Sequence, residues 1–365
     1  MTEYMTFFPV GNGDMTLLTT DSKKNLLFDC NMKKSAEEES NSDFDCNEYL
    51  HDILEQDEDI LFVDAMFLTH SDQDHCRGMV EYFNLCKPED VDNEKIRINE
   101  LFVPARLLLE DEHRNDDADA IRDEANRRLD LFGTDEFDLN GNRLKIVGYS
   151  EELKDYNDII IAAGENIPDI ADISEDGVEI FVLRPVKRDT DDQNAGVNDC
   201  TASFKLTFTI SGEKFVAIIG GDITCENWKE VIKYNSDLEF DILLAPHHCS
   251  WHSVSTEDTK DGEADEEVED FLEKSKNRAY VIASSKKIKR NDDNPPSYRA
   301  KNVYIKHLQD DERFICTAEY PDEDNPKPLV MKITSQGVSI KPSSSSVTSK
   351  NNYTPKSYGD NVYVE

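Results

Sequence analysis

Short apolar runs of β-strand type recur along most of this chain, and they constrain its fold more than any other feature. Three examples are "AMFLTH" at residues 65–70, "FKLTFTI" at 204–210 and "KFVAIIGGD" at 214–222. Many such strands, with occasional helices packed outside them, predict an α/β layered sandwich. A single large domain accounts for them more economically than two domains do. Helices are predicted between the strands at residues 46–56, 75–86, 226–234 and 265–276.

The composition excludes several classes of protein. Among 365 residues, 78 Asp and Glu outweigh 40 Lys and Arg, which gives a formal net charge of −38. A surface this acidic repels phosphate, which disfavours a general DNA- or membrane-coating role but permits a local cationic site. No apolar run approaches the roughly 18–20 residues of a membrane helix, and residues 1–14 lack the features of a signal peptide. We therefore expect a soluble, cytoplasmic protein, and its eight cysteines, which form no CxxC pair, to be free thiols.

The acidic residues are concentrated in a few polar stretches. We interpret residues near 35–60, 108–135 and 256–273 as acidic surface insertions, the second of which contains a helix that ends at Gly133. The Ser- and Asn-rich residues 341–365 are predicted to be a loose C-terminal tail. One domain is therefore expected to span residues 1–340.

Histidine placement is the feature of the sequence that points to chemistry. Two of the eight His lie within residues 70–75 and three within residues 247–252. One apolar run ends just before the first cluster, a second ends before Asp222, and a third ends before His247. Functional pockets usually form at such strand ends, and imidazole with carboxylate is the ligand set of hydrolytic zinc and manganese sites. The candidate metal ligands are His70, Asp72, Asp74, His75, Asp222, His247 and His248.

The order of these segments resembles the metallo-β-lactamase fold superfamily. The most similar subgroup is the metallo-β-lactamase domain of ComEC/Rec2-type DNA-uptake proteins and their soluble relatives. That subgroup begins with a "DVGQGD" turn, to which "PVGNGDMTLL" is similar, and "NLLFDCN" supplies Asp29 at the end of the next strand. Thr69 to His75 match its metal loop, T-H-x-D-x-D-H, at every fixed position, while "IIGGD" and "PHHCSWHS" are similar to its "LTGD" and "PHHGSxxS". The resemblance covers roughly residues 5–310 and implies a four-layer αββα sandwich.

The resemblance also implies a role for each candidate ligand. His70 and Asp72 would bind one metal ion, zinc or manganese. Asp74, His75 and one of His247 and His248 would bind a second ion, and Asp222 would bridge the two. Asp74 is the residue that we expect to orient the nucleophilic water, which makes it the catalytic candidate.

The sequence departs from the family pattern at two places, and both bear on substrate binding. No His lies between His113 and His247, where many family members supply a further ligand, and the segment "NDCTASFKL" offers Asn198 and Ser203 instead. The late "YGHP" of the subgroup is replaced by "DDNPPS", so Asn294 stands where a catalytic or substrate-contacting His would be. With Ser250 of the "PHHCS" motif, these residues are the predicted polar contacts to substrate.

One basic stretch interrupts the acidic chain. Residues 274–306 contain ten Lys and Arg and only two Asp and Glu, a local balance of 10 − 2 = +8. The resemblance places the end of "AYVIASS" beside the metal pocket, so a cationic rim would hold a phosphate backbone or a nucleotide there. An ordinary solvated basic face is the alternative. The predicted rim residues are Lys286, Lys287, Lys289, Arg290 and Arg299.

Two classes of function follow from these observations. The first is a metal-dependent hydrolase that acts on nucleic acid or nucleotide as a nuclease or phosphodiesterase; thioester or lactam hydrolysis would use the same metal site. The second is a non-catalytic module that docks basic protein through the acidic insertions. A degenerate module would be expected to have lost ligands, and the predicted ligand set is intact, which favours the enzyme.

Overall fold

The structure is a computed structural model and describes residues 1–38, 41–110, 112–192, 196, 198–235, 237–259, 262–290 and 294–342. Most of the predicted tail at 341–365 therefore lies outside the described residues. Within the described residues, no helix combines the length and the apolar character needed to cross a membrane.

The first sheet combines the N-terminal half of the chain with the last hairpin, in the order β10-β9-β8-β6-β3-β2-β1-β17-β18. Strands β1, β2 and β3 pair antiparallel, whereas β3, β6, β8, β9 and β10 run parallel to one another. The carboxyl ends of β3 and β6 therefore meet at one edge of the sheet. The bounds are β1 Glu3–Phe7, β2 Thr16–Thr19, β3 Asn25–Phe28, β6 Ile60–Phe67, β8 Ile96–Pro104, β9 Arg143–Val147, β10 Ile160–Ile161, β17 Leu329–Thr334 and β18 Gly337–Ile340. Two short strands pair at the side: β5 (Gln56–Asp57) with β6, and β7 (Phe83–Asn84) with β8. The two-residue β4 spans Cys30–Asn31.

The second sheet is built from the later part of the chain, in the order β11-β12-β13-β14-β15-β16. Its first three strands are antiparallel, and β13 to β16 are parallel. The carboxyl ends of β13, β14 and β15 therefore lie at one edge. The bounds are β11 Val178–Arg184, β12 Ser203–Ile210, β13 Glu213–Ile219, β14 Phe240–Leu244, β15 Ser275–Ala283 and β16 Phe314–Cys316.

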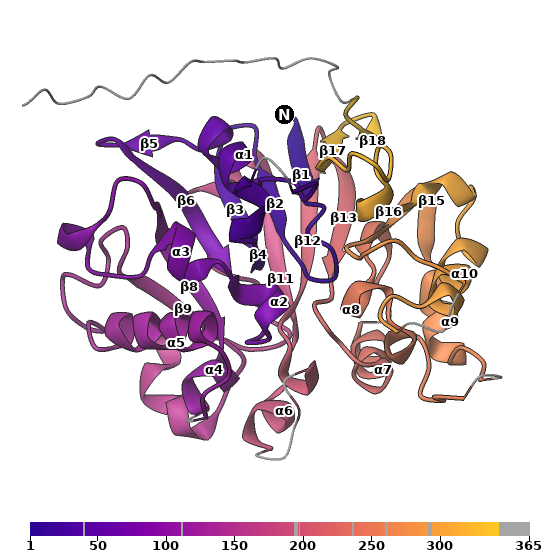
Figure 1. The fold of residues 1–365 in the computed structure, drawn as a ribbon. Helices are drawn as coiled ribbons and strands as arrows, with labels where there is room; N and C mark the ends of the chain where they lie inside the picture. Colours follow the sequence, from indigo (N-terminus) through magenta and orange to yellow (C-terminus); the bar gives the residue numbers. More distant parts are fainter. Residues whose placement is uncertain are drawn as a thin grey trace, which may run out of the picture.

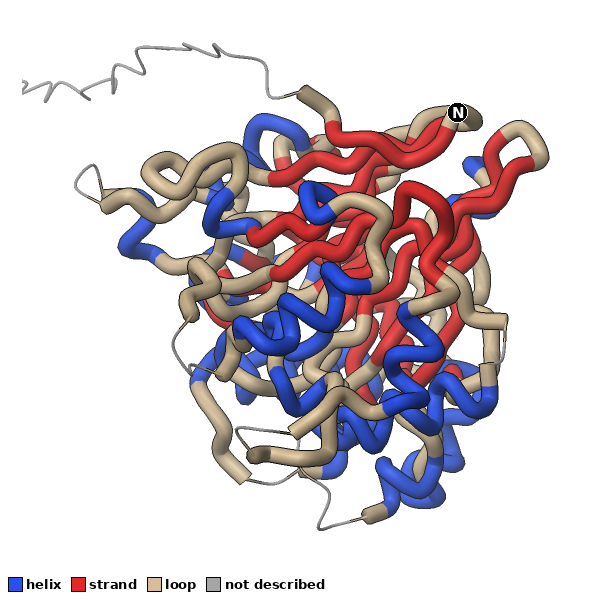
Figure 2. The backbone as a smooth tube through the Cα atoms, turned by 90° about the vertical axis from the view of Figure 1, so that its right-hand side faces the viewer, coloured by secondary structure: helices blue, strands red, loops and turns tan. Residues whose placement is uncertain are grey.

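Three apolar clusters hold these elements in layers. The middle cluster lies between the two sheets, where Phe67 stacks on Phe28 at 4.5 Å between ring centroids and meets Phe204 of the second sheet edge-on at 5.4 Å. The alternate residues of β12 all join this cluster, as a strand with one face buried requires. The outer clusters lie between each sheet and its helices. This arrangement confirms the expected four-layer αββα sandwich, which Figures 1 and 2 show from two sides.

Amphipathic helices form the outer layers. In Figure 1 the first sheet is covered by α1 (Cys46–Ile53), α3 (Met79–Tyr82) and α5 (Asp116–Leu129), and the second by α7 (Cys225–Tyr234), α9 (Glu266–Leu272) and α10 (Tyr298–Lys306). The predicted acidic insertions contain α1, α5 and α9, each of which buries apolar side chains on one face. The acidic stretches thus also contribute helices that pack against the core.

The predicted helix at 75–86 is wrong. Two short helices, α2 (Gln73–Cys76) and α3, replace it, and β7 begins at Phe83. Gly78 separates the helices with a left-handed φ of +91°, and a Cβ at this position would lie 2.9 Å from the carbonyl oxygen of Met32. The break places His75 at the end of a single turn beside the sheet.

Candidate metal centre

The predicted ligands come together where strands of both sheets end. The loop after β6 carries His70 to His75, the loop after β13 carries Asp222, and the loop after β14 carries the His pair. Two backbone hydrogen bonds hold these loops: Ala202 N, just before β12, donates to Thr69 O of the loop after β6 at 2.8 Å, and His247 N donates to Gly221 O at 2.9 Å, which joins the loops after β14 and β13. The shared edge thus converts three distant motifs into one side-chain cluster.

Four of these side chains surround one position. His75 Nε2 lies 3.2 Å from Asp222 Oδ1 and 3.3 Å from His248 Nε2. His248 Nε2 in turn lies 3.3 Å from Asp74 Oδ2 and 3.5 Å from Asp222 Oδ1. A tetrahedral zinc site with bonds of about 2.0–2.1 Å has ligand–ligand distances of about 3.3–3.4 Å. The residues therefore fit such an ion, and we call this set the His75 position.

The other oxygen of Asp222 faces a second set. Asp222 Oδ2 lies 3.6 Å from His70 Nε2 and 3.5 Å from His247 Nε2. Asp72 Oδ2 lies 3.8 Å from His70 Nε2. His70 Nε2 is buried without a hydrogen-bond partner among the described residues, as expected of an atom that awaits a cation. We call this set, which also fits a divalent ion, the His70 position.

The structure separates the two histidines that the sequence left as alternatives. His248 belongs to the His75 position and His247 to the His70 position, one on each side of Asp222. Three consecutive non-glycine residues, His247, His248 and Cys249, have φ between +52° and +66°, and this conformation costs roughly 1–2 kcal/mol per residue. His247 is thus placed where it could serve as a further ligand at the His70 position.

A buried carboxylate outside the two positions holds the metal loop. Asp29, at the end of β3, accepts hydrogen bonds from the N–H and the hydroxyl of Thr69, both at 2.7 Å. Its Oδ2 also lies 2.8 Å from His75 Nδ1, the nitrogen that faces away from the cluster. A carboxylate on the outer nitrogen fixes the ring and leaves Nε2 free for a metal.

Asp14 is the residue that our sequence analysis missed. With His75, Asp222 and His248 it forms a buried group whose ligand atoms all lie within 4.8 Å of one another, and the described part of the chain shows no other such group. The signal was present, because Asp14 ends the "VGNGD" turn that carries part of the resemblance. Its side chain approaches the cluster at 3.3 Å, between Oδ1 and His248 Nδ1.

The electrostatics of the cluster favour a bound cation. Burial alone would raise the pKa of Asp222, but His248 and His75 beside it hold that pKa well below its usual range. Burial would also raise the pKa of Asp74, but the hydrogen bond to His248 and the nearby imidazoles outweigh it and lower this pKa to about 2. Burial lowers the pKa of His75, yet Asp222 and Asp29 raise it well above its usual value. The carboxylates are therefore ionised at neutral pH and attract positive charge.

The predicted polar contacts to substrate have other partners. Ser203 is fully buried and donates to Gly220 O at 2.7 Å. Ser250 is also fully buried and donates to Asn294 Oδ1 at 3.0 Å, and the same oxygen accepts the N–H of Trp251 at 2.8 Å. These three side chains brace the loops of the site, and their expected contact with substrate stays a prediction. Asn198 is half-buried in the turn before β12, and its predicted role stays untested.

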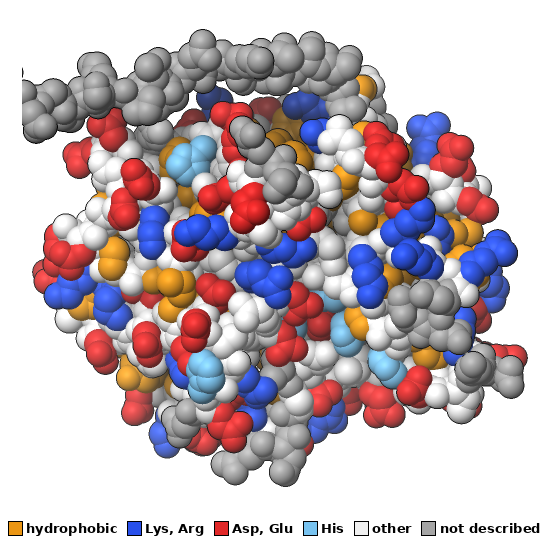
Figure 3. Space-filling view, viewed as in Figure 1, with side chains coloured by type: hydrophobic (Ala, Val, Ile, Leu, Met, Phe, Trp, Pro, Cys, Tyr) orange, Lys and Arg blue, Asp and Glu red, His pale blue; other side chains and the backbone are white. Residues whose placement is uncertain are grey.

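The basic stretch begins at the rim of the cluster. Ser284 Oγ donates to Gly13 O at 2.7 Å, and Lys286 N donates to Asn12 Oδ1 at 3.0 Å, so the end of β15 is tied to the turn that carries Asp14. Lys286 and Lys289 are exposed. Figure 3 shows Lys and Arg side chains gathered on the side of the molecule that carries β15 and α10, with His side chains nearby.

The other predicted rim residues have partners within the protein. Lys287 pairs with Glu323, and the guanidinium of Arg290 lies 5.3 Å from the ring centroid of Tyr298. The guanidinium of Arg299 stacks on Trp251 at 3.6 Å and donates to the carbonyl oxygens of Thr259 and Gly262. Arg299 is therefore a structural residue, and Lys286 and Lys289 remain as the stronger rim candidates.

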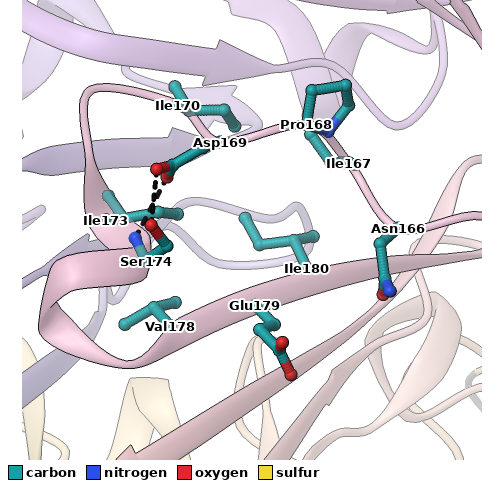
Figure 4. Close-up of a pocket in the computed structure, with 10 residues that line it drawn as sticks. All are labelled: Asn166, Ile167, Pro168, Asp169, Ile170, Ile173, Ser174, Val178, Glu179 and Ile180. Carbon is teal, nitrogen blue, oxygen red and sulfur yellow. Dashed lines mark hydrogen bonds between the residues drawn. The ribbon is translucent and has the colours of Figure 1, made fainter.

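A hollow of about 150 Å³ lies elsewhere, between the 166–174 loop and β11 (Figure 4). Its inner wall is aliphatic, and its carboxylate Asp169 is bonded to Ser174 N at 3.0 Å. It therefore offers no cluster of ligand-type groups. Its lining is Asn166, Ile167, Pro168, Asp169, Ile170, Ile173, Ser174, Val178, Glu179 and Ile180.

Comparisons with known proteins find similarity among solved structures alone. No model of a known protein family matches the sequence, and no curated protein matches it. A β-lactamase from Chitinophaga pinensis is similar, with 13% identity, a TM-score of 0.30, and coverage of 72% of this chain and 85% of that chain. The metallo-β-lactamase GOB-18 from Elizabethkingia meningoseptica is also similar, with 10% identity, a TM-score of 0.30, and coverage of 82% and 83%.

Proposed function

We propose that the protein is a metal-dependent hydrolase that cleaves phosphodiesters, either as a nuclease or on nucleotides. The observation that carries this proposal is the position of Asp222, which directs one oxygen to each of two complete ligand sets. A carboxylate that bridges two such sets is suited to a pair of ions. The donor set of imidazole and carboxylate favours zinc or manganese.

Each residue of the cluster then has a defined task. When bound, two such ions lower the pKa of a water molecule and stabilise negative charge on the reacting oxygens. His70, Asp72 and His247 would hold one ion, and His75, His248 and Asp74 the other. The side chain of Asp74 is one-third exposed, so its ionised carboxylate can also orient a water or receive its proton.

The basic rim supports a phosphodiester substrate. Lys286 is joined to the metal centre through Asn12 and the Gly13 turn, so a cation stands beside the site in a chain of net charge −38. Repulsion by the acidic remainder would confine a polyanion to this rim. A lactam or a neutral ester makes no use of such a rim. The intact ligand sets argue against a module that merely docks a basic protein.

Metal content and hydrolysis together test the proposal. Purified wild-type protein should contain one to two equivalents of zinc or manganese and hydrolyse at least one substrate in a panel of DNA, phosphodiester and cyclic nucleotide. Asp222→Asn should reduce the metal content, because it removes the charge that both positions share. Asp74→Asn should reduce turnover by about 100-fold or more with little change in folding.

The matched control is Glu179→Gln, which removes an exposed carboxylate on β11 and should change neither metal content nor turnover. Wild-type protein that carries two metal ions but hydrolyses nothing in the panel would contradict the enzyme and favour the docking module. Equal turnover by Asp74→Asn and wild type would contradict the role given to Asp74.

A further inference from the structure

A hydrogen-bond donor and a hydrogen-bond acceptor from neighbouring residues both contact the same ring nitrogen of His248. Gly13 N–H points at His248 Nδ1 from 3.2 Å, and Asp14 Oδ1 lies 3.3 Å from that nitrogen. Both contacts come from the turn between β1 and β2, whereas the opposite nitrogen, Nε2, faces His75, Asp74 and Asp222. The turn therefore contacts the outer edge of the ring.

The two contacts favour different forms of the imidazole. If Nδ1 accepts the Gly13 N–H, a neutral ring carries its hydrogen on Nε2 and cannot bind a metal there. If Nδ1 carries the hydrogen, it can donate to Asp14 and leaves Nε2 with a free lone pair. The acceptor at position 14 thus decides whether Nε2 can serve as a ligand.

Asp14 has the properties that this role requires. Its side chain is buried in the described structure, and Oδ1 has no hydrogen-bond partner among the described residues. A buried carboxylate oxygen without a donor is costly, and the His248 Nδ1 hydrogen would satisfy it. Asp29 makes the equivalent contact at the neighbouring histidine, with its Oδ2 lying 2.8 Å from the outer nitrogen of His75, Nδ1.

We propose that Asp14 is a positioning residue that selects the Nδ1–H form of His248 and thereby completes the His75 position for a metal ion. The proposal rests on the proposed function, because it presupposes an ion between His75 and His248. The proposed role of Asp14 applies to the His75 position alone. At the His70 position, His247 Nδ1 is buried without a hydrogen-bond partner in the described part of the chain.

Zinc titration of metal-stripped protein against a chromophoric chelator tests the proposal. Wild type should bind two equivalents. Asp14→Asn should bind one equivalent as wild type does and the other about 10–100-fold more weakly, the usual cost of losing an outer partner of a metal ligand. Asp222→Asn should weaken both equivalents, and Glu179→Gln should weaken neither.

The outcomes separate this inference from the proposed function. Wild type that binds no zinc would overturn both. If wild type binds two equivalents and Asp14→Asn binds both unchanged, the inference is overturned and the proposed function stands. The same conclusion follows if Asp14→Asn weakens both equivalents equally.

Nitrogen-15 spectra of histidine in the zinc-loaded wild type provide a test that needs no foldable variant. The His248 resonance, assigned with His248→Gln, should show the hydrogen on Nδ1, and a hydrogen on Nε2 would overturn the inference.

Discussion

Glu3 illustrates at the scale of one residue how burial controls charge in an acidic chain. It is fully buried in β1, and burial raises its pKa to about 7 even though Asp21 N–H donates to it at 2.9 Å. The negative charges of Asp176 and Asp21 raise the pKa further. Because the ordinary value is 4.5, the folded state binds this proton more tightly than the unfolded state does. Its contribution to stability is therefore present below pH 4.5 and is lost as the pH rises through 7.

Glu3→Gln should remove this loss of stability at rising pH. Relative to wild type, the variant should gain about 1–2 kcal/mol in free energy of unfolding between pH 5.5 and pH 8, because Gln stays neutral throughout. Urea unfolding at the two pH values measures the difference. Glu179→Gln, which changes the same charge on the surface, should show no such pH-dependent gain. An equal effect of Glu3→Gln at both pH values would contradict the assignment.

At the scale of elements, helix α5 holds the metal loop. Asn115 caps the helix by accepting Ala118 N–H at 2.9 Å, and its amide donates to Ser71 O of the loop at 3.0 Å. Asp117, in the first turn, accepts Gln73 Nε2–H at 2.9 Å. The Asn115 side chain thus caps the start of α5 and anchors the segment that presents His70 and His75.

Asn115→Ala should therefore have two effects. It should lower the free energy of unfolding by about 1–2 kcal/mol through the lost cap, and it should weaken zinc binding because the metal loop loses its anchor. The control is Asp45→Ala, which removes the cap of α1 at Glu48 N but touches no loop of the site. Urea unfolding and zinc titration of both variants check this. Equal zinc affinity in the two variants would show that α5 acts on stability alone.

At the scale of the whole molecule, the charge distribution determines how a polyanion can approach. A chain of net charge −38 with a basic segment at one rim should bind nucleic acid only there and with a clear dependence on salt. Lys286→Gln with Lys289→Gln should flatten the slope of log K against log salt by about 1.4 for single-stranded DNA, or about 0.7 for each lost phosphate contact. Turnover of DNA should fall at the same time.

The matched control is Lys23→Gln with Lys24→Gln, at the opposite end of β3 from the site. It removes the same charge and should leave the salt slope unchanged. Binding of short single-stranded DNA at several salt concentrations measures both variants. The same slope for wild type and the rim variant would remove nucleic acid as the substrate and leave small phosphoesters.

Much of the fold and of the ligand set could be predicted from local patterns. Strand-length apolar runs read directly as buried strands, because burial acts on each residue with a period that the sequence displays. The ligands follow those runs by one to three residues, so the order of residues is enough to place His70, Asp222 and His247 at strand ends. Local rules also identified α1, α5, α7 and α9, though not the break at Gly78, where a close approach to Met32 O requires glycine.

Only the tertiary structure decided how those residues face one another. Adjacent His247 and His248 serve opposite sides of Asp222 because their backbone is left-handed, a conformation that a pattern of residue types does not reveal. Asp14 reaches His248 across 234 positions of sequence because two sheets bring their ends together. Conversely, Ser250 matches a position of the family motif and Asn294 replaces one, yet the two side chains form a hydrogen bond with each other. The sequence by itself determined which chemical groups stand at the strand ends; the packing of the two sheets determined which of them face a common position, since that depends on ångström distances between residues far apart in the chain.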